Sequence, residues 1–156
     1  RKEALKFSAA HLTVFPDGTK ESLHGHNYRT VVKVEFAKHS VEEMLPFSEL
    51  KAGMRTLCQA WDEKVLLAEN NPFGQFVRRD GREVETIICG KRYVFPADEV
   101  MILPVDNITT EALSRLFCEK LVESLPRESL ARAGVTRIET KIEEMLGQGA
   151  AYVIEL

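Results

Sequence analysis

The sequence predicts one α+β domain with an antiparallel sheet, and three observations lead to this fold class. Alternating apolar residues indicate strands toward both ends of the chain, and two stretches between them have helical spacing. The 156 residues, 44% of them hydrophobic, suffice for one ordinary domain and are too few for two. Strand pairs that flank paired helices are typical of an α+β domain rather than of a βαβ fold.

The first two predicted strands form a hairpin. Apolar residues alternate from Leu5 to His11 and again from Tyr28 to Phe36. Between them, residues 15–19 (FPDGT) have a turn composition that would let the strands pair antiparallel. This hairpin carries three of the four histidines.

Two amphipathic helices are expected next. Apolar residues recur every three or four positions up to Trp61, and Ser48 is placed to cap the start of this helix. A second helix is expected from about Thr110 to Leu125, where Pro126 stops it. Both apolar stripes are most simply core faces.

The segment between the helices is predicted to be an insertion with a hairpin. Residues 83–88 and 92–95 have strand composition around a short turn, and a short apolar stretch, 100–103, follows them. After the second helix, residues 138–144 alternate again, and residues 151–156 form the last predicted strand.

Composition excludes several classes of function. Lys and Arg number 21 against 24 Asp and Glu, and these charges are interspersed, which argues against nucleic-acid binding. No apolar run approaches the roughly 20 residues that span a bilayer, and no targeting segment is visible, so a soluble protein is expected. Cys58, Cys89 and Cys118 form neither a disulfide framework nor a CxxC pattern, so the cytoplasm is the expected compartment.

Three histidines form a candidate metal site. His24 and His26 point the same way because side chains two apart share a strand face, and Gly25 leaves room between them. His11 would complete the set if the hairpin register holds. Three imidazoles leave the fourth position of tetrahedral zinc open, as in catalytic sites. The alternative is three ordinary surface or core histidines, and His39 is expected to be a surface residue.

The motifs around these histidines resemble a known family. FSAAH (7–11) followed by LHGHNY (23–28) resembles the signature of the 6-pyruvoyl tetrahydropterin synthase and 6-carboxytetrahydropterin synthase family. Three further blocks match it: LPFSELK (45–51), WD (61–62) and TTE (109–111). The resemblance covers both ends of the chain and leaves about 70–103 as an insertion that small members lack.

The resemblance implies a fold and an assembly. Each subunit of the tunnelling fold (T-fold) contributes four antiparallel strands, with two helices between the strand pairs, and residues 1–156 would form one such domain with an inserted hairpin. Subunits form a barrel, and stacked barrels usually make a homohexamer, a dimer of trimers. The active sites lie between subunits.

The resemblance also implies an activity. Zn²⁺ would be held by His11, His24 and His26, and the substrate would be a dihydropterin such as 7,8-dihydroneopterin triphosphate. Zinc lowers the pKa of a bound hydroxyl and polarises a carbonyl, which suits this chemistry. The expected protein is a zinc-dependent lyase or synthase of folate or queuosine biosynthesis, with neither nucleic acid nor membrane as a partner.

Substrate-binding residues follow from the same resemblance. Glu144 lies eight residues before Tyr152, like the family's ring-binding glutamate, and its parity places it on the inward face. A carboxylate there can accept both parallel N–H groups of a pterin edge. Glu143 should face out. Thr109 and Thr110 are expected to help bind substrate, and the alternative for Glu144 is a solvated strand carboxylate.

The chain departs from the family at the catalytic cysteine, because residues 19–22 (TKES) contain none. Glu21, in ESLHGH, instead resembles a variant class in which glutamate replaces the cysteine and side-chain cleavage gives 6-hydroxymethyl-7,8-dihydropterin. A carboxylate beside zinc can act as a general base if desolvation raises its pKa toward neutrality. The alternative is a surface loop glutamate.

A second departure lies at the end of the first helix, where Asp62-Glu63 replaces the family's Asp-His relay. Either the relay is rebuilt from Asp62, Glu63 and Glu21 as a carboxylate cluster, which we favour, or it is broken. Glu63 could also simply pair with Lys64 or Arg55.

Several functions therefore remain open. The leading hypothesis is side-chain cleavage to a 6-hydroxymethyl pterin, with 6-pyruvoyl or 6-carboxy products as further outcomes. A catalytically degenerate pterin- or purine-binding homologue would keep the fold and the zinc site. A third hypothesis is different chemistry on a related heterocycle, with the insertion reshaping the pocket mouth.

Overall fold

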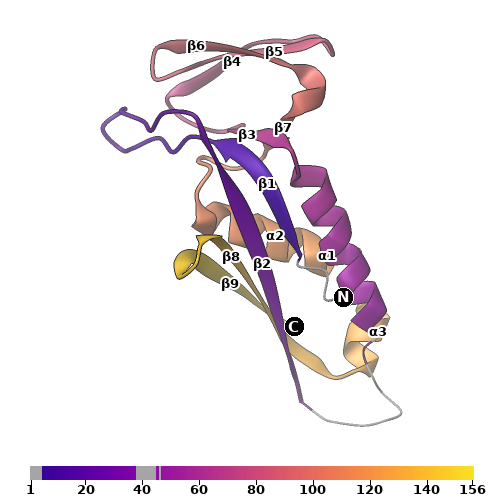
Figure 1. Ribbon diagram of the computed structural model, residues 1–156. Coiled ribbons are helices and arrows are strands. Elements are labelled where there is room, and N and C mark those ends of the chain that lie inside the picture. Colours follow the sequence, from indigo (N-terminus) through magenta and orange to yellow (C-terminus); the bar gives the residue numbers. More distant parts are fainter. Residues whose placement is uncertain (1–4, 38–44, 46) are drawn as a thin grey trace.

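The computed structural model describes residues 5–37, 45 and 47–156 (Figure 1). His39, expected at the surface, and Pro46, in the LPFSELK block, lie outside these described residues. The elements are β1 (Lys6–His11), β2 (His24–Phe36), α1 (Phe47–Trp61), β3 (Lys64–Ala68), β4 (Gly74–Arg79), β5 (Glu83–Ile88), β6 (Lys91–Pro96), the 3-10 turn η1 (Ala97–Glu99), β7 (Val100–Leu103), α2 (Thr110–Ser124), α3 (Arg127–Arg132), β8 (Val135–Met145) and β9 (Gln148–Glu155).

The main sheet has the strand order β7-β3-β1-β2-β8-β9. Its four strands β1, β2, β8 and β9 pair antiparallel in the expected way, so the predicted four-stranded sheet is confirmed. Two parallel strands, β3 beside β1 and β7 beside β3, extend this sheet and were not predicted. A short apolar run such as VLLA does not alternate, so periodicity cannot identify it as a strand.

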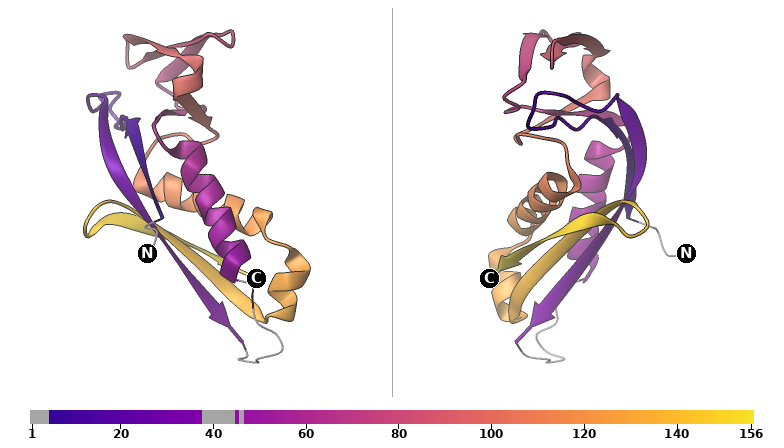
Figure 2. Two further views of the ribbon diagram at one scale, coloured as in Figure 1. Left: turned by 45° about the vertical axis from the view of Figure 1, so that its right-hand side comes forward. Right: turned by 90° about the vertical axis from the view of Figure 1, so that its left-hand side faces the viewer.

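Both long helices cover one face of the main sheet (Figure 2). Under them lies an apolar core in which the rings of Phe7 and Tyr28 stack with centroids 4.8 Å apart and Trp61 meets Phe7 edge-on. Helix α1 begins at Phe47, so Ser48 lies inside its first turn rather than at the cap position. Within the described residues, no helix is long and apolar enough to span a membrane.

Helix α2 ends at Ser124, one residue before the predicted end. Pro126 does stop it, but the chain continues at once into α3, which was not predicted. Proline lacks a backbone N–H, and the start of a helix leaves its first N–H groups unpaired, so the same residue can end one helix and precede the next.

The insertion forms a separate three-stranded sheet, β4-β5-β6, above the main sheet in Figure 1. The hairpin of β5 and β6 was predicted, whereas β4 was not. A second apolar cluster joins this sheet to the main one and to the β1–β2 connection. Its buried members are Leu12, Val14, Leu67, Val84 and Ile88.

Candidate metal centre

The hairpin of β1 and β2 brings the three predicted histidines together. In the register of this hairpin, His11 lies opposite His24, and Ala9 lies opposite His26. One ring nitrogen from each histidine lies within 4.8 Å of the others, which is close enough to hold one metal ion. His11 is 3% exposed, and His26 is half-buried.

Backbone carbonyls orient two of these imidazoles. Nδ1 of His11 lies 2.9 Å from the carbonyl oxygen of Ile108, and Nδ1 of His24 lies 2.8 Å from that of Ser22. A carbonyl oxygen only accepts hydrogen bonds, so each Nδ1 carries the proton and each Nε2 is left with a free lone pair. This is the usual outer-shell arrangement of metal-binding histidines.

The buried Nε2 of His11 fits a metal ligand. Among the described residues it has no hydrogen-bond partner, and a buried polar atom without a partner is costly. Burial is the largest influence on the pKa of His11 and lowers it; the charges of His24 and His26 lower it further, against the Ile108 carbonyl and Glu144, which raise it. The neutral imidazole that a metal requires is therefore the favoured form.

Glu144 reaches the same cluster from β8. Its Oε2 lies 3.7 Å from Nε2 of His26 and 3.9 Å from Nε2 of His11. The β8–β9 pairing is irregular between Glu143 and Met145. These two distances place the Glu144 carboxylate on the inward side, as predicted, bordering the histidine nitrogens.

Glu143 differs from the prediction in its exposure. It shares the opposite face of β8 with Lys141, whose Nζ lies 2.6 Å from its Oε1. This bond is the main reason that the pKa of Glu143 is lowered. The side chain is only 8% exposed, so it is covered rather than solvated.

Glu21 lies in the β1–β2 connection and is fixed by the backbone of Thr13. Its Oε2 accepts from the Thr13 N–H at 3.2 Å, and its own N–H donates to the Thr13 carbonyl at 2.9 Å. Burial raises the pKa of Glu21, but the Thr13 hydrogen bonds and the charges of His24 and His11 outweigh burial, so the pKa is lowered. The condition named for a near-neutral base, a pKa raised by desolvation, is therefore not met in the metal-free chain.

Asp62 and Glu63 follow α1 and lie along the edge of β1. Oδ1 of Asp62 accepts from the Ser8 N–H at 2.7 Å, and the Glu63 N–H donates to the Ser8 carbonyl at 2.7 Å. Glu63 has a φ of 56°, a left-handed conformation that is uncommon for a residue with a side chain.

Both acids are exposed, and Glu63 lines an open cleft of about 360 Å³ with Ser8 and Asn27. Ser8 and Asn27 alternate with the histidine-bearing positions of their strands, and His26 also lines this cleft. Among the described residues, Glu144 approaches the histidines, and Glu21 is near enough for the charges of His24 and His11 to act on it. Asp62 and Glu63 lie at the edge of β1.

Thr109 and Thr110 lie where α2 begins, immediately after Ile108. The Thr109 hydroxyl caps the helix by accepting from the Ala112 N–H at 3.3 Å. The Thr110 hydroxyl lies 3.4 Å from Oε2 of Glu111. Both residues thus border the carbonyl that orients His11.

Tyr28 is a site residue that the sequence reasoning missed. It is fully buried, its ring centroid lies 5.6 Å from that of His26 and 6.0 Å from that of His11, and its hydroxyl has no partner among the described residues. Burial is the main cause that raises its pKa, with Glu144 and Glu21 adding to it, so the phenol stays protonated. The alternation of β2 could have identified it, because Tyr28 follows His24 and His26 on the same face.

Known proteins resemble this chain over nearly its whole length. The family profile described as 6-pyruvoyl tetrahydropterin synthase matches residues 2–154. A protein of Methanocaldococcus jannaschii named "Putative 6-carboxy-5,6,7,8-tetrahydropterin synthase" is 30% identical over 149 residues, which cover 95% of this chain and 89% of the relative. A Pyrococcus abyssi protein of the same name is 28% identical over 102 residues, 65% of this chain and 59% of that one.

Solved structures share the fold. The 6-pyruvoyl tetrahydropterin synthase of Plasmodium falciparum superposes with a TM-score of 0.89 at 24% identity, covering 97% of this chain and 93% of that one. The Plasmodium vivax enzyme gives the same score and coverage at 22% identity. Two further structures are variants of the P. vivax enzyme in which a catalytic glutamate is replaced by alanine or cysteine. The predicted tunnelling fold is confirmed.

Proposed function

This chain belongs to the 6-pyruvoyl tetrahydropterin synthase family, and we propose that it is a zinc-dependent lyase of that family acting on 7,8-dihydroneopterin triphosphate or a close relative. The reaction we propose is cleavage of the substrate side chain to give 6-hydroxymethyl-7,8-dihydropterin. The observation that carries this proposal is the carboxylate of Glu21, which Thr13 fixes and which lies near enough to His24 and His11 for their charges to lower its pKa.

In this proposal His11, His24 and His26 hold Zn²⁺ through the Nε2 atoms that their backbone-bound Nδ1 atoms leave available. The bound ion would supply Lewis acidity to the side-chain hydroxyls of the substrate. The carbonyls of Ile108 and Ser22 keep His11 and His24 in the tautomer that binds metal.

Glu21 acts as the general base in this scheme. Thr13 occupies its Oε2, which leaves Oε1 to take a proton from a substrate hydroxyl. Its lowered pKa means that the carboxylate is ionised, and so ready to accept, at neutral pH. Transfer of this proton to Glu21 lets the hydroxyl oxygen become the carbonyl of a departing aldehyde as the adjacent carbon–carbon bond breaks. The electron pair of that bond passes into the pterin ring, and the proton returns to the side-chain carbon that stays on the ring, which gives the 6-hydroxymethyl product. The catalytic glutamate named for the P. vivax enzyme supports this role.

Glu144 binds the substrate on the other side of the histidines. As the ring anchor it accepts the two N–H groups of the pterin edge. Its distance of 3.7 Å from Nε2 of His26 also lets it meet a substrate hydroxyl. Thr109 and Thr110 are the proposed further contacts, because they adjoin the Ile108 carbonyl that orients His11.

Asp62 and Glu63 serve the site of a neighbouring subunit in this proposal. Their exposure at the edge of β1 suits a role outside their own chain. The assembly would be a cytoplasmic homohexamer, a dimer of trimers, with residues 1–156 acting as one domain.

Two other functions have specific support. The names of the archaeal relatives favour a 6-carboxy product, although this chain has no cysteine at 19–22 to do the family's chemistry. The missing histidine of the Asp-His relay favours a homologue that binds a pterin or purine without turning it over.

Glu21→Gln tests the proposal, because glutamine keeps an oxygen for the Thr13 N–H but cannot act as a base. We expect turnover to fall by about 10²–10⁴-fold, the usual contribution of a general base, with zinc content and pterin binding retained. Glu128→Gln on the exposed side of α3 is the matched control and should keep full activity. Unchanged turnover in Glu21→Gln would remove Glu21 from the mechanism.

A further inference from the structure

The connection between β1 and β2, residues 12–23, carries Glu21. Backbone contacts join its first residues to its last ones. Val14 and Lys20 form an isolated antiparallel bridge, and Thr13 exchanges hydrogen bonds with Glu21. The position of the Glu21 carboxylate therefore follows the position of the Thr13-Val14 backbone.

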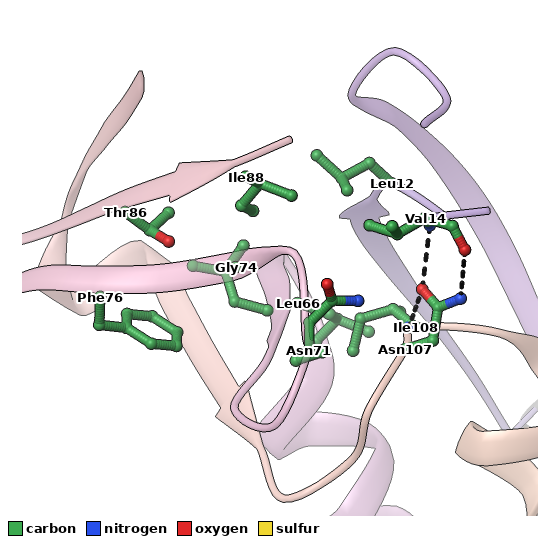
Figure 3. A pocket seen from close by; sticks show the side chains of 12 residues that line it. Leu12, Val14, Leu66, Asn71, Gly74, Phe76, Thr86, Ile88, Asn107 and Ile108 are labelled. Carbon is green, nitrogen blue, oxygen red and sulfur yellow. Dashed lines mark hydrogen bonds between the residues drawn. The ribbon is translucent and has the colours of Figure 1, made fainter. Parts of the chain in front are cut away.

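Asn107, from the segment before α2, holds that backbone (Figure 3). Its Oδ1 accepts from the Val14 N–H at 3.1 Å, and its Nδ2 donates to the Val14 carbonyl at 2.8 Å. The same Oδ1 also accepts from the Ile108 N–H at 3.1 Å. One amide side chain thus binds both backbone groups of a residue 93 positions away.

Asn107 also lies next to the group that orients a metal-binding residue. The carbonyl of Ile108 accepts from Nδ1 of His11, and the N–H of Ile108 is held by Asn107. The Asn107-Ile108 pair is therefore in contact with the histidine cluster on one side and with the Glu21 loop on the other.

This inference rests on the function proposed above. We propose that Asn107 is a positioning residue that fixes the Glu21 loop relative to the histidine cluster, acting through Val14 and Thr13 without touching the substrate. A displacement of about 1 Å in a reacting group can cost about 10²-fold in rate, so this placement matters for turnover.

The loop has other supports that would keep it folded without Asn107. Leu12 and Val14 pack in the second apolar cluster with Ile88 of the inserted sheet. The ammonium of Lys20 lies 5.2 Å from the ring centroid of Tyr93. Removal of the Asn107 amide should therefore loosen the loop rather than unfold it.

Asn71 is a matched control for this residue. It lines the same small pocket (Figure 3). Its amide likewise donates to a backbone carbonyl, that of Asp106, and accepts from a backbone N–H, that of Phe73. Neither bond joins the loop, although the ring of Phe73 lies against Gly18. Asn71→Ala and Asn107→Ala thus remove the same kind of interaction, and only the second frees Val14.

The first test measures hydrogen exchange in the zinc-loaded protein and needs no activity. Amides of residues 12–23 should exchange faster in Asn107→Ala than in Asn71→Ala or the unmodified protein. Asn107→Asp keeps the acceptor for both N–H groups but sets a charged oxygen against the Val14 carbonyl in place of the donor, so exchange faster than in the unmodified protein is expected. This variant serves if the alanine variant does not fold. Equal exchange in all variants would overturn the proposal.

The second test is a double-mutant cycle on turnover. Asn107→Ala should lower kcat by about 10- to 100-fold with KM for the pterin and zinc content unchanged, while Asn71→Ala keeps kcat. In the Glu21→Gln background the Asn107 change should have no further effect, because both act on the same proton transfer. Additive losses would overturn the proposal. Absence of turnover in the unmodified enzyme would instead refute the proposed function, and the exchange measurement would still test the loop contact.

Discussion

One face of the β1–β2 hairpin and one of its edges hold different parts of the predicted acid–base set. On the helix-covered face, the carboxylate of Glu144 approaches His11 and His26, and Glu21 in the connection is close enough for its pKa to feel His11 and His24. At the edge of β1, Asp62 and Glu63 are exposed and bind the backbone of Ser8. The difference shows that a single chain gathers three histidines that could hold a metal ion together with two glutamates, while Asp62 and Glu63 are presented to the outside.

The largest effect is expected from His11→Ala on the helix-covered face. This change removes a buried ligand, so we expect zinc affinity to fall by more than the roughly 100-fold that an outer-shell change can cost, and turnover to be lost. Zinc stoichiometry after dialysis, with Ser8→Ala on the opposite face as the control, measures this. Full zinc occupancy in His11→Ala would contradict the metal assignment.

The next effect concerns Asp62 at the edge of β1. If Asp62 serves a neighbouring site, Asp62→Asn should lower turnover by about 10²–10⁴-fold, the range for acid–base groups. Zinc should be retained. Subunits carrying Asp62→Asn, mixed with subunits carrying Glu21→Gln, should then recover part of the activity, because some sites in mixed oligomers have both groups intact. No recovery, with mixed oligomers verified by mass, would place both groups in one chain's site.

A smaller effect is expected at the β8–β9 turn that aims Glu144. A Cβ added at Gly149 would lie 2.2 Å from the carbonyl oxygen of Ile142, so Gly149→Ala must separate the strands. We expect a loss of about 1–3 kcal/mol in the free energy of unfolding and weaker pterin binding. Gly74→Ala, in another strand and without a positive φ, is the control, because its added Cβ would meet its nearest atom at 3.4 Å, an ordinary contact. Equal pterin affinity in both variants would argue against the ring-anchor role.

The smallest effect is the pH dependence of the zinc-free protein. The pKa of His11 is lowered from 6.5 by folding, so the unfolded chain binds more protons than the folded one below about pH 6.5. Stability should therefore fall as pH decreases through this range. The test compares thermal unfolding midpoints between pH 7.5 and 5.5 in the zinc-free protein and in zinc-free His11→Ala. In the variant, the part of the fall in stability that His11 causes should vanish. Identical slopes of midpoint against pH in the two proteins would contradict the lowering of the His11 pKa by burial.

Much of this architecture follows from local sequence patterns. Alternation with period two predicts β1, β2 and β8, and it also predicts that His11, His24 and His26 share a face. The hairpin turn then sets which of them meet. This explains why the cluster of three histidines could be inferred before the structure was known. The backbone carbonyls that bind the Nδ1 atoms of His11 and His24 could not be inferred.

What the sequence did not reveal depends on distant partners. Strand β3 was missed because its apolar run has no alternation and pairs in parallel with β1. The lowered pKa of Glu21 results from a hydrogen bond to Thr13, eight residues away, and the role of Asn107 from contacts with Val14 across the fold. A lone loop asparagine carries no pattern that names its partner.

The most direct test of the central claim is product analysis. Purified, zinc-loaded protein is incubated with 7,8-dihydroneopterin triphosphate, and the pterins are identified by mass spectrometry. The proposal predicts 6-hydroxymethyl-7,8-dihydropterin, and its formation should disappear with Glu21→Gln. A carboxy or pyruvoyl product, or bound substrate that is never converted, would contradict the claim that Glu21 directs side-chain cleavage.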